Sequence, residues 1–380
     1  MASLLRGAAA RGTHPPARLL RHTTPPRLSF HAMVVQSAKT AGAGRTAELA
    51  SFDRLDQLPR QDPAADVEVG VTHSTLNYKD GLIVLGKPGV VRNFPIVAGI
   101  DYAGVVRASR SAALREGDAV VLTGNKAGQY FDGGYAQRAA CQAEWLVRLP
   151  AAFDAADAMT IGTAGVTAMM CVRQLERVGG LKADYGPVLV TGAAGGLGQL
   201  AVAILAKRGY HVIASTGRVA EQQSLLQSLG ATEVIGRLEA VDKPLGPQRW
   251  VGVVDSVGGA TLAAAAAQTM YGGAIASTGV AGGGQLETTV YPFILRGVRL
   301  LGVDSTLPWR LDGYPQDEER WLEWRKERLG IWEDLSDTLT RKELALVHAG
   351  SIELKDVYDH AQKILDGKIA GRLVVDIPTE

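Results

Sequence analysis

A strand pattern at residues 187–190 runs through a glycine-rich loop directly into a helical pattern, and this stretch constrains the fold more than any other. The strand part is rich in Val and Leu, which is typical of a parallel strand buried on both faces. Gly192, Gly195 and Gly198 follow, and residues 199–208 have helical periodicity. Glycines placed in this way allow a tight turn, the close approach of a pyrophosphate and tight helix packing. A plain glycine-rich turn is the alternative, but the flanking strand and helix favour a dinucleotide site.

The next expected strand, residues 211–216, indicates which dinucleotide binds. Folds that select NAD usually place Asp or Glu at the end of this strand, where the carboxylate accepts hydrogen bonds from the ribose diol. Here the strand ends in Ser215 and Thr216, and Arg218 follows. Hydroxyls and a guanidinium suit an extra 2′-phosphate, so we predict NADPH as cofactor. A surface arginine without a ligand is the alternative interpretation.

Short apolar strands and helical patterns continue to alternate up to residue 305. We expect strands at residues 232–236, 251–256, 273–280 and 299–305, and helices at 221–229, 261–270 and 291–296. This alternation predicts an α/β fold with a Rossmann-type, doubly wound parallel sheet. The cofactor should lie in the crevice at the C-terminal ends of the strands.

The chain before residue 150 has many short strands separated by glycine turns, which predicts a barrel-like β domain. A helix at 154–175 should lead from this domain into the next. A charged helix is expected at 317–329, and a final strand at 371–377 should return to the first sheet. We therefore expect a discontinuous catalytic domain, residues 33–155 and 306–380, and a nucleotide-binding domain at 156–305.

Composition excludes several other classes of protein. The net charge is +1, which gives no reason to expect nucleic acid or an anionic membrane surface as a partner. No apolar run approaches the roughly 20 residues that span a bilayer, so we expect no membrane insertion. The chain has two cysteines, which excludes a framework of several disulfides and a multi-cysteine zinc site.

The first 32 residues differ from the rest of the chain. They contain prolines, Ser, Thr, Ala and Leu and five arginines: Arg6, Arg11, Arg18, Arg21 and Arg27. All five precede the first acidic residue of the chain, Glu48. A basic, acid-free leader of this kind predicts a transit peptide and an organelle matrix, mitochondrial in preference to plastid. A disordered tail without an address, in a cytoplasmic protein, is the alternative, and Met33 is a second candidate start.

Six segments together resemble one group of the medium-chain dehydrogenase/reductase superfamily. They are Leu76–Gly81 (LNYKDG), Gly99–Gly104 (GIDYAG), Ile161–Ala168, Val190–Gly198 (VTGAAGGLG), Val254–Gly259 (VDSVGG) and Pro292–Ser305. The segments are similar to those of the acrylyl-CoA reductases, which are also described as zinc-free NADPH:quinone oxidoreductases. The resemblance covers most of the chain from about residue 33. It implies a GroES-like β-barrel catalytic domain beside the Rossmann domain. The region from Leu307 to Leu335, with its four tryptophans, is longer than the family pattern and leaves substrate size open.

Metal dependence separates this group from the zinc alcohol dehydrogenases of the same superfamily. Those enzymes carry Gly-His-Glu where this chain has Gly99-Ile100-Asp101. A catalytic zinc needs about three converging protein ligands. Outside the leader the only histidines are His73, His211, His348 and His360, and none stands at a ligand position of the family pattern. We predict metal-independent chemistry.

The resemblance also implies roles for individual residues. The pyrophosphate should lie on Ala194, Gly195, Gly196 and Leu197. The 2′-phosphate should be surrounded by Thr216, Gly217, Arg218 and Arg237. The nicotinamide side should be approached by Val280, Ile294, Ser305 and the turn from Gly367 to Arg372. Tyr78 is expected both to contact NADPH and to act in catalysis.

The catalytic candidates are Asn77, Tyr78 and Asp80. Tyr78 is expected to donate a proton in a closed, poorly hydrated cleft, and Asn77 to orient substrate or water. Asp80 either fixes Lys79 or Tyr78, or only caps the helix that follows.

The predicted function is reduction of the C=C bond of a short 2-enoyl-CoA, most simply acrylyl-CoA to propanoyl-CoA. Hydride addition to a conjugated C=C bond needs no Lewis acid on the carbonyl, which agrees with the absence of zinc ligands. A quinone or enone reductase and a non-catalytic NADPH-binding protein are the alternatives. The expected partners are a small acyl-CoA or quinone substrate and a second copy of the chain in a homodimer.

Overall fold

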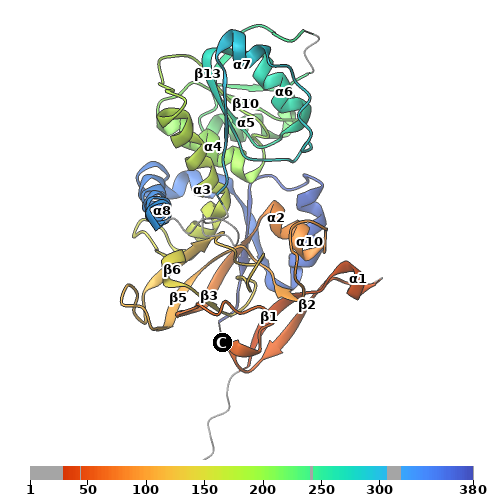
Figure 1. Ribbon diagram of the computed structural model, residues 1–380, viewed down its shortest axis with the longest axis vertical. Helices are drawn as coiled ribbons and strands as arrows, with labels where there is room; N and C mark the ends of the chain where they lie inside the picture. The colour runs from red at the N-terminus through yellow and green to blue at the C-terminus, as the bar shows by residue number, and fades with distance from the viewer. Residues whose placement is uncertain (1–28, 43, 240–242, 306–317, 380) are drawn as a thin grey trace, which may run out of the picture.

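The computed structural model describes residues 29–42, 44–239, 243–305 and 318–379, and their strands form three sheets. Figure 1 shows two halves, one above the other, each built around a larger sheet, with α3 (Ala155–Arg177) between them. The upper half holds residues from the middle of the chain. The lower half combines residues from the beginning and the end.

The upper half is a six-stranded sheet in the order β11-β10-β9-β12-β13-β14, in which every neighbouring pair is parallel. Its strands are β9 (Val188–Val190), β10 (Val212–Ser215), β11 (Glu233–Ile235), β12 (Trp250–Asp255), β13 (Thr269–Ser277) and β14 (Arg299–Gly302). The helices between them are α4 (Gly196–Lys207), α5 (Val219–Ser228), α6 (Gly259–Ala267) and α7 (Tyr291–Arg296). This is the doubly wound dinucleotide-binding order, in which the chain reverses beside the first strand. The predicted Rossmann-type sheet is confirmed.

The lower half holds a seven-stranded sheet in the order β15-β16-β3-β5-β6-β8, with β7 paired to β3, and a three-stranded sheet in the order β2-β1-β4. The strands are β1 (Phe30–Val35), β2 (Ala47–Phe52), β3 (Val67–Leu76), β4 (Ile96–Val97), β5 (Asp101–Ser109), β6 (Ala119–Thr123), β7 (Arg138–Cys141), β8 (Val147–Arg148), β15 (His348–Glu353) and β16 (Arg372–Asp376). Because β16 pairs antiparallel with β3, the end of the chain completes the sheet that the beginning starts. The predicted return strand is therefore present.

The first strand begins earlier than the sequence indicated. β1 starts at Phe30, whose ring is fully buried and packs on Phe52 of β2 with ring centroids 5.8 Å apart. Residues 30–32, which we assigned to the leader, are therefore part of the folded chain. The rest of the predicted leader, up to residue 28, lies outside the described residues.

Helix α3 joins the two halves and packs on both. With 23 residues it is long and apolar enough to cross a membrane by length and composition, but 78% of its most apolar 18-residue stretch is buried inside the protein. The expectation that no segment approaches this length was wrong, and burial on both sides explains the composition. The helix is broken at Gly162, where φ is +49° and ψ is −161°.

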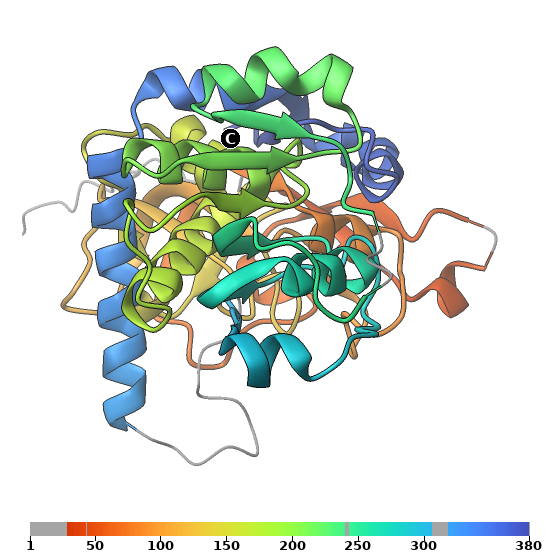
Figure 2. The same cartoon turned by 90° about the horizontal axis from the view of Figure 1, so that it is seen from above.

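The remaining elements cover the edges of the two halves. They are α1 (Ala38–Ala41), α2 (Tyr78–Val84), α8 (Glu318–Thr338), α9 (Arg341–Val347) and α10 (Val357–Leu365), with short 3-10 turns at Leu55–Gln57, Ala143–Trp145 and Leu354–Asp356. Seen from above in Figure 2, α8 runs along one side of the molecule. Trp321, Trp324 and Trp332 of α8 are all buried, so they are core residues. Trp309 lies outside the described residues.

Candidate active site

Three strands of the lower sheet bring their polar ends to one point. β3 runs antiparallel to both β5 and β16, so the end of β3 lies beside the first residues of the other two strands. Asn77 directly follows β3, Asp101 begins β5 and Arg372 begins β16. All three side chains are buried, with hydrogen bonds between them: Asn77 Nδ2 donates to Asp101 Oδ2 at 2.9 Å, and Arg372 Nη1 donates to Asn77 Oδ1 at 2.9 Å.

Asn77 is also the N-cap of α2, and Asp80 completes a capping box three residues later. The fully buried Asp80 carboxylate accepts from the Asn77 backbone N–H and from Asn77 Nδ2, each at 3.0 Å, and from the Ile100 N–H at 2.9 Å. Burial and the neighbouring Asp101 raise the pKa of Asp80 to about 7. Of the two roles considered for Asp80, these contacts favour the cap.

The kink in α3 brings a second set of donors to Asp101. At Gly162 a Cβ would lie 2.7 Å from Arg372 Nη2 and 2.8 Å from Asp101 Oδ2, so only glycine lets these groups approach. Helix restarts at Thr163, whose N–H donates to Asp101 Oδ2 at 2.7 Å and whose hydroxyl donates to Oδ1. Asp101, at the start of β5, thereby caps the N-terminus of the second half of α3.

Arg372 connects this polar centre to the glycine loop. Its guanidinium donates to Thr75 Oγ1 at 2.8 Å and to the Thr160 carbonyl at 3.2 Å, besides its bond to Asn77. A Cβ on Gly196 would lie only 2.4 Å from the Arg372 Cδ, so the arginine packs directly on this glycine. The Gly371 N–H donates to the Ala194 carbonyl at 3.2 Å. Arg372 thus contacts both the turn that carries Tyr78 and the glycine loop. Burial lowers the pKa of its guanidinium.

The glycine loop has the shape that a bound pyrophosphate requires. Gly192 has φ +61°, and a Cβ on Gly198 would lie 2.4 Å from the Gly192 carbonyl oxygen, so turn and helix pack without side chains. Helix α4 begins at Gly196, and the N–H groups of its first turn have no partner within the helix. Thr191 Oγ1 donates to the buried Asp255 carboxylate at 2.7 Å, which fixes the loop to the end of β12.

The residues predicted for the 2′-phosphate lie together at the ends of β10 and β11. Thr216 is buried, and its Oγ1 accepts from the Arg218 N–H at 3.2 Å. Arg237 lies against Gly217, where a Cβ would be 2.5 Å from Nε. Arg218 Nη2 lies 3.4 Å from the Ile369 carbonyl, so the 367–372 turn reaches this end of the site as well as the glycine loop.

The predicted nicotinamide residues are more dispersed. Ser305 is buried and its hydroxyl bonds Thr167 of α3. Val280, which follows β13, is exposed. Ile294 is 67% exposed on α7, which packs on β13 and lies at the end of the upper half that is farther from α2 in Figure 1. The structure does not bring Ile294 to the turn that carries Tyr78.

Tyr78 is the first residue of α2 and is 39% exposed. The expectation that its phenol lies in a closed, poorly hydrated cleft was wrong for this structure, because Tyr78 is exposed to solvent. Asn77 and Asp80 are beside it in sequence but turn inward.

The sequence did not single out Asp101, Thr163 or Arg372 as members of a polar network. Asp101 was noted only as a departure from a zinc-ligand motif, and Arg372 only as the end of a turn. A buried charge at a strand end, opposite a glycine inside a helical pattern, is the signal that marks such a network. Among the residues that the structure describes, no group of three or more His, Cys, Asp or Glu side chains is placed to hold a metal ion.

Fold and site together define a dinucleotide-dependent oxidoreductase with a β domain and a parallel-sheet domain. Two family models match the chain: the alcohol dehydrogenase GroES-like domain over residues 63–151 and the zinc-binding dehydrogenase over residues 196–319.

Individual relatives show which group of dehydrogenases and reductases the chain resembles. Acrylyl-CoA reductase AcuI from Ruegeria pomeroyi is 43% identical over 354 residues, which covers 92% of this chain and 99% of the relative. The structure of Escherichia coli YhdH with bound NADPH is 40% identical and covers 91% of this chain and 100% of its own, with a TM-score of 0.80. The structure of Bacillus subtilis YhfP, a putative quinone oxidoreductase, has NAD bound and is 38% identical. It covers 92% of this chain and 99% of its own, with a TM-score of 0.80. The chain belongs to the medium-chain dehydrogenase/reductase family, in the group of the acrylyl-CoA reductases. The predicted family and fold are confirmed.

These relatives correct one prediction. All three are bacterial proteins, and they match the chain over nearly its whole length. The predicted location in a mitochondrial or plastid matrix is contradicted by this finding. A basic, acid-free composition was too general a signal to carry that conclusion.

Proposed function

We propose that the chain is an NADPH-dependent reductase of the C=C bond of a short 2-enoyl-CoA, converting acrylyl-CoA to propanoyl-CoA. The observation that carries this proposal is the 43% identity to an acrylyl-CoA reductase over 99% of that relative. The chemistry of the site agrees with it. The Asp101 carboxylate, at the position of the zinc-enzyme motif, is surrounded by donors from Asn77, Thr163 and Gly124, as suits a structural anchor and not a metal ligand.

The residues fit NADPH. The first turn of α4 and the backbone of 194–197 would hold the pyrophosphate, and Thr216, Gly217, Arg218 and Arg237 would surround the 2′-phosphate. No carboxylate stands at the end of β10 to select a free ribose diol, although one related structure holds NAD. When bound, the reduced nicotinamide supplies a hydride to the β-carbon of the substrate.

After this hydride transfer the protein has to stabilise the displaced electron pair and supply one proton. The C=C electron pair moves toward the thioester, whose oxygen becomes an enolate, and the α-carbon then takes one proton. The balance is one hydride and one proton added across the double bond. Tyr78, exposed at the start of α2, is the proposed proton donor, with water as the other source. Asn77 is held by Arg372, Asp101 and Asp80, so it keeps the orientation of the turn that carries Tyr78.

A quinone or enone reductase is the second candidate function, because the related YhfP is named a putative quinone oxidoreductase. Both reactions use the same cofactor but differ in the acceptor. The test is NADPH oxidation by the purified protein with acrylyl-CoA, crotonyl-CoA and 1,4-benzoquinone in parallel. The highest kcat/KM with acrylyl-CoA supports the proposal, and activity with the quinone alone contradicts it. Cofactor binding without turnover of any acceptor would leave the non-catalytic NADPH-binding role.

We propose a homodimer that pairs through β14. This strand is the edge of the upper sheet, and most of its residues are exposed. Large apolar side chains around it are also exposed: Val280, Val290, Tyr291, Ile294, Leu295 and Leu300. An open, apolar sheet edge favours pairing with a second copy, and a twofold axis allows the same strand to serve both partners.

The domain division remains part of the proposal: residues 33–155 and 306–380 as the catalytic domain and 156–305 as the cofactor domain, with the start moved to Phe30. The pairing of β16 with β3 supports the discontinuous catalytic domain. Burial of α3 in the core and a net charge of +1 support a protein that neither inserts into membranes nor binds nucleic acid.

A further inference from the structure

Helix α8 places a buried arginine close to the polar centre. Arg328 is only 5% exposed, and its Nη2 donates to the Ser305 carbonyl at 2.6 Å, while Nη1 lies 3.4 Å from Thr123 Oγ1. Ser305 follows β14 of the upper half, and Thr123 ends β6 of the lower half. Arg328 therefore lies where the two halves meet, on the side on which Ser305 is expected to approach the nicotinamide.

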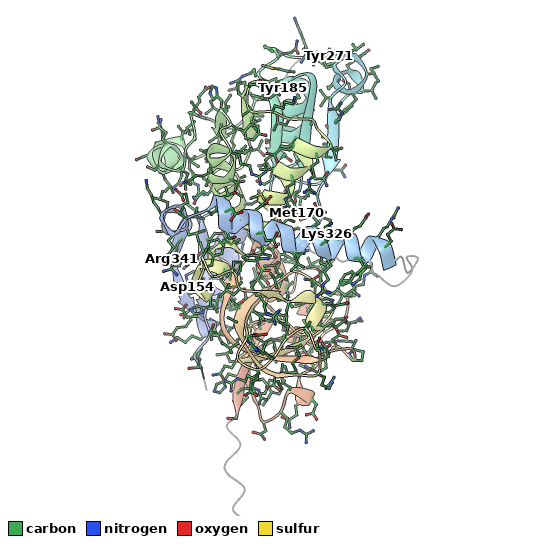
Figure 3. The ribbon with its side chains drawn as sticks, turned by 90° about the vertical axis from the view of Figure 1, so that its left-hand side faces the viewer. Asp154, Met170, Tyr185, Tyr271, Lys326 and Arg341 are labelled. Carbon is green, nitrogen blue, oxygen red and sulfur yellow. The ribbon has the colours of Figure 1, made fainter. Side chains whose placement is uncertain are left out.

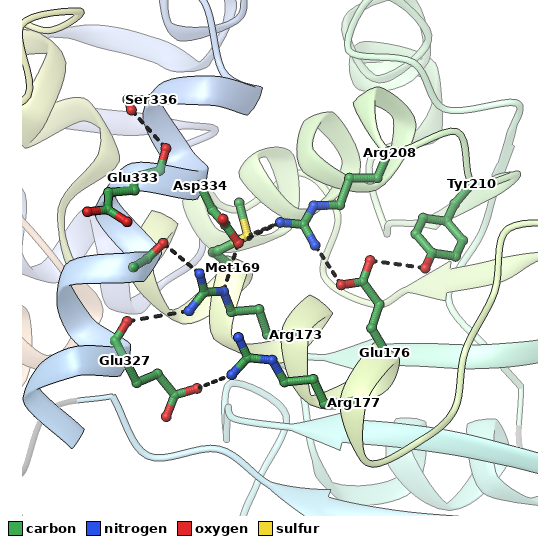
Figure 4. Close-up of polar contacts among 11 residues, drawn as sticks. Met169, Arg173, Glu176, Arg177, Arg208, Tyr210, Glu327, Glu333, Asp334 and Ser336 are labelled. Atoms are coloured by element: carbon green, nitrogen blue, oxygen red, sulfur yellow. Dashed lines mark hydrogen bonds and ion pairs between the residues drawn. The ribbon is translucent and has the colours of Figure 1, made fainter. Parts of the chain in front are cut away.

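The helix that carries Arg328 is fixed on its other face. Asp334 accepts from Arg173 Nε of α3 at 2.7 Å and from Arg208 Nη2, at the end of α4, at 2.8 Å. Arg173 Nη2 also donates to the Gly330 carbonyl at 2.6 Å. Figure 4 shows these contacts joining α8 to the helices of the upper half, and Figure 3 shows α8 lying across the middle of the molecule. A helix held in this way presents Arg328 in one orientation.

Packing and electrostatics fix the guanidinium further. Its carbon lies 4.8 Å from the centroid of the Trp324 ring, which covers one face. The negative charges of Asp101, Asp304 and Glu327 attract the guanidinium, which opposes the effect of burial on its pKa. Burial lowers the pKa of Arg328 to about 10, so the group stays charged at neutral pH.

Burying a guanidinium costs free energy, which hydrogen bonds and opposite charges offset. A guanidinium has five N–H donors, and its contacts with Ser305 and Thr123 both use neutral oxygens. An oxygen that gains negative charge during the reaction would complete the set. The phosphates of a CoA substrate would lie at the outer end of such a thioester, farther from this buried point.

We propose that Arg328 is a catalytic residue whose guanidinium binds the thioester oxygen of the substrate and stabilises its charge as the enolate forms. This inference rests on the proposed function. The hydride adds to the β-carbon, the C=C pair moves to the thioester oxygen, and Arg328 donates to that oxygen until the α-carbon is protonated. Donors aimed at the place where charge develops are among the largest contributions to catalysis.

The test compares R328M with the wild type on acrylyl-CoA and on acrylyl-pantetheine, which lacks the nucleotide phosphates of CoA. We expect kcat/KM to fall about a hundredfold with both substrates, while the Kd for NADPH changes less than about twofold. A loss confined to acrylyl-CoA would mean that Arg328 holds a CoA phosphate. An equal loss in NADPH affinity would place it at the cofactor. Either result, or no loss, overturns the inference.

Two further variants keep the test informative. K326M removes an exposed cation from the same helix (labelled in Figure 3) and should leave kcat/KM unchanged. In R328A, added guanidinium ion at tens of millimolar should restore part of kcat, which a purely structural arginine would not allow. If R328M does not fold, R328K replaces it. We expect kcat/KM of R328K to fall about tenfold, because lysine keeps the positive charge but lacks the planar guanidinium with its several N–H donors.

The substrate proposal and the role of Arg328 can fail separately. The wild-type rate with acrylyl-CoA tests the substrate alone. If the wild type reduces only enones, the proposed function fails, but the ratio of R328M to wild type on methyl vinyl ketone still tests the role of the guanidinium at a carbonyl oxygen.

Discussion

Arg372 Nη1 donates to Asn77 Oδ1 at 2.9 Å, across 295 residues of sequence. The same arginine packs its Cδ against Gly196 at the start of the cofactor helix. A rigid side chain therefore links the turn that carries Tyr78 to the loop expected to hold the pyrophosphate. If these two segments hold substrate and cofactor as proposed, their relative position depends on this guanidinium.

We expect Arg372→Lys to lower kcat/KM about tenfold or more while leaving the Kd for NADPH within a few-fold. Lysine keeps the charge, but its single nitrogen cannot serve Thr75, Asn77 and Thr160 together. Steady-state kinetics and fluorescence titration of NADPH measure the two quantities. Arg341→Lys, at an exposed site of the same half, is the control and should match the wild type. Unchanged kcat/KM in Arg372→Lys would contradict the proposed link.

Asp80 gives a prediction for stability against pH. Its folded pKa is about 7, above the ordinary carboxyl value of 3.8, so the folded protein binds a proton that the unfolded chain releases. The free energy of unfolding should therefore fall, relative to Asp80→Asn, as pH rises from about 4 to about 7, and stay level above that. Over this pH interval the free energy of unfolding should fall by on the order of 4 kcal/mol. Urea denaturation at several pH values measures it. Asp53→Asn, at an exposed site, should show no such difference from the wild type, and a parallel pH profile for Asp80→Asn would refute the assignment.

Local sequence signals predicted the parts of the site that local structure forms. The glycine loop from Gly192 to Gly198 joins one strand to one helix, so its residues are neighbours in sequence. The pair of Asn77 and Asp80 likewise follows the spacing of a capping box. Arg372 and Asp101 could not be predicted as their partners, because strand pairing between distant segments brings them there. Gly162 stands inside an apparently continuous helical pattern, so the sequence did not indicate a kink there. Its contacts with Arg372 and Asp101, which come from distant segments, explain why a glycine is needed.

Cofactor selectivity should depend on Arg218. We expect Arg218→Ala to raise the KM for NADPH about tenfold or more and to leave that for NADH nearly unchanged, since a charge-assisted hydrogen bond contributes roughly 1.5–3 kcal/mol. Arg218 is half-buried at the end of β10, where Thr216 and Arg237 also lie. Initial rates with each cofactor at saturating substrate provide the test. Arg92→Ala, at an exposed site in the lower half, is the control, and equal effects on both cofactors would remove Arg218 from the 2′-phosphate site.

The proposed dimer predicts a change of mass in solution. The chain has a mass of 40.1 kDa, so light scattering after size exclusion should give about twice that value for the wild type. Leu300→Lys places a charge on the exposed edge strand β14 and should shift the mass to that of the monomer. Leu322→Lys, at an even more exposed leucine on α8, should remain dimeric. A monomeric wild type would reject the interface.

Tyr78→Phe separates the two roles proposed for this residue. The substitution removes only the hydroxyl, so the fold and most NADPH binding should remain. If the phenol donates the proton or steadies the enolate, kcat for acrylyl-CoA should fall about a hundredfold while the Kd for NADPH changes little, because one well-placed donor lowers the barrier by about 2.7–4 kcal/mol. Tyr130→Phe is a matched control, since that tyrosine is also 39% exposed. A near-wild-type kcat in Tyr78→Phe, with a weaker NADPH Kd, would leave Tyr78 as a cofactor contact and make water the proton source.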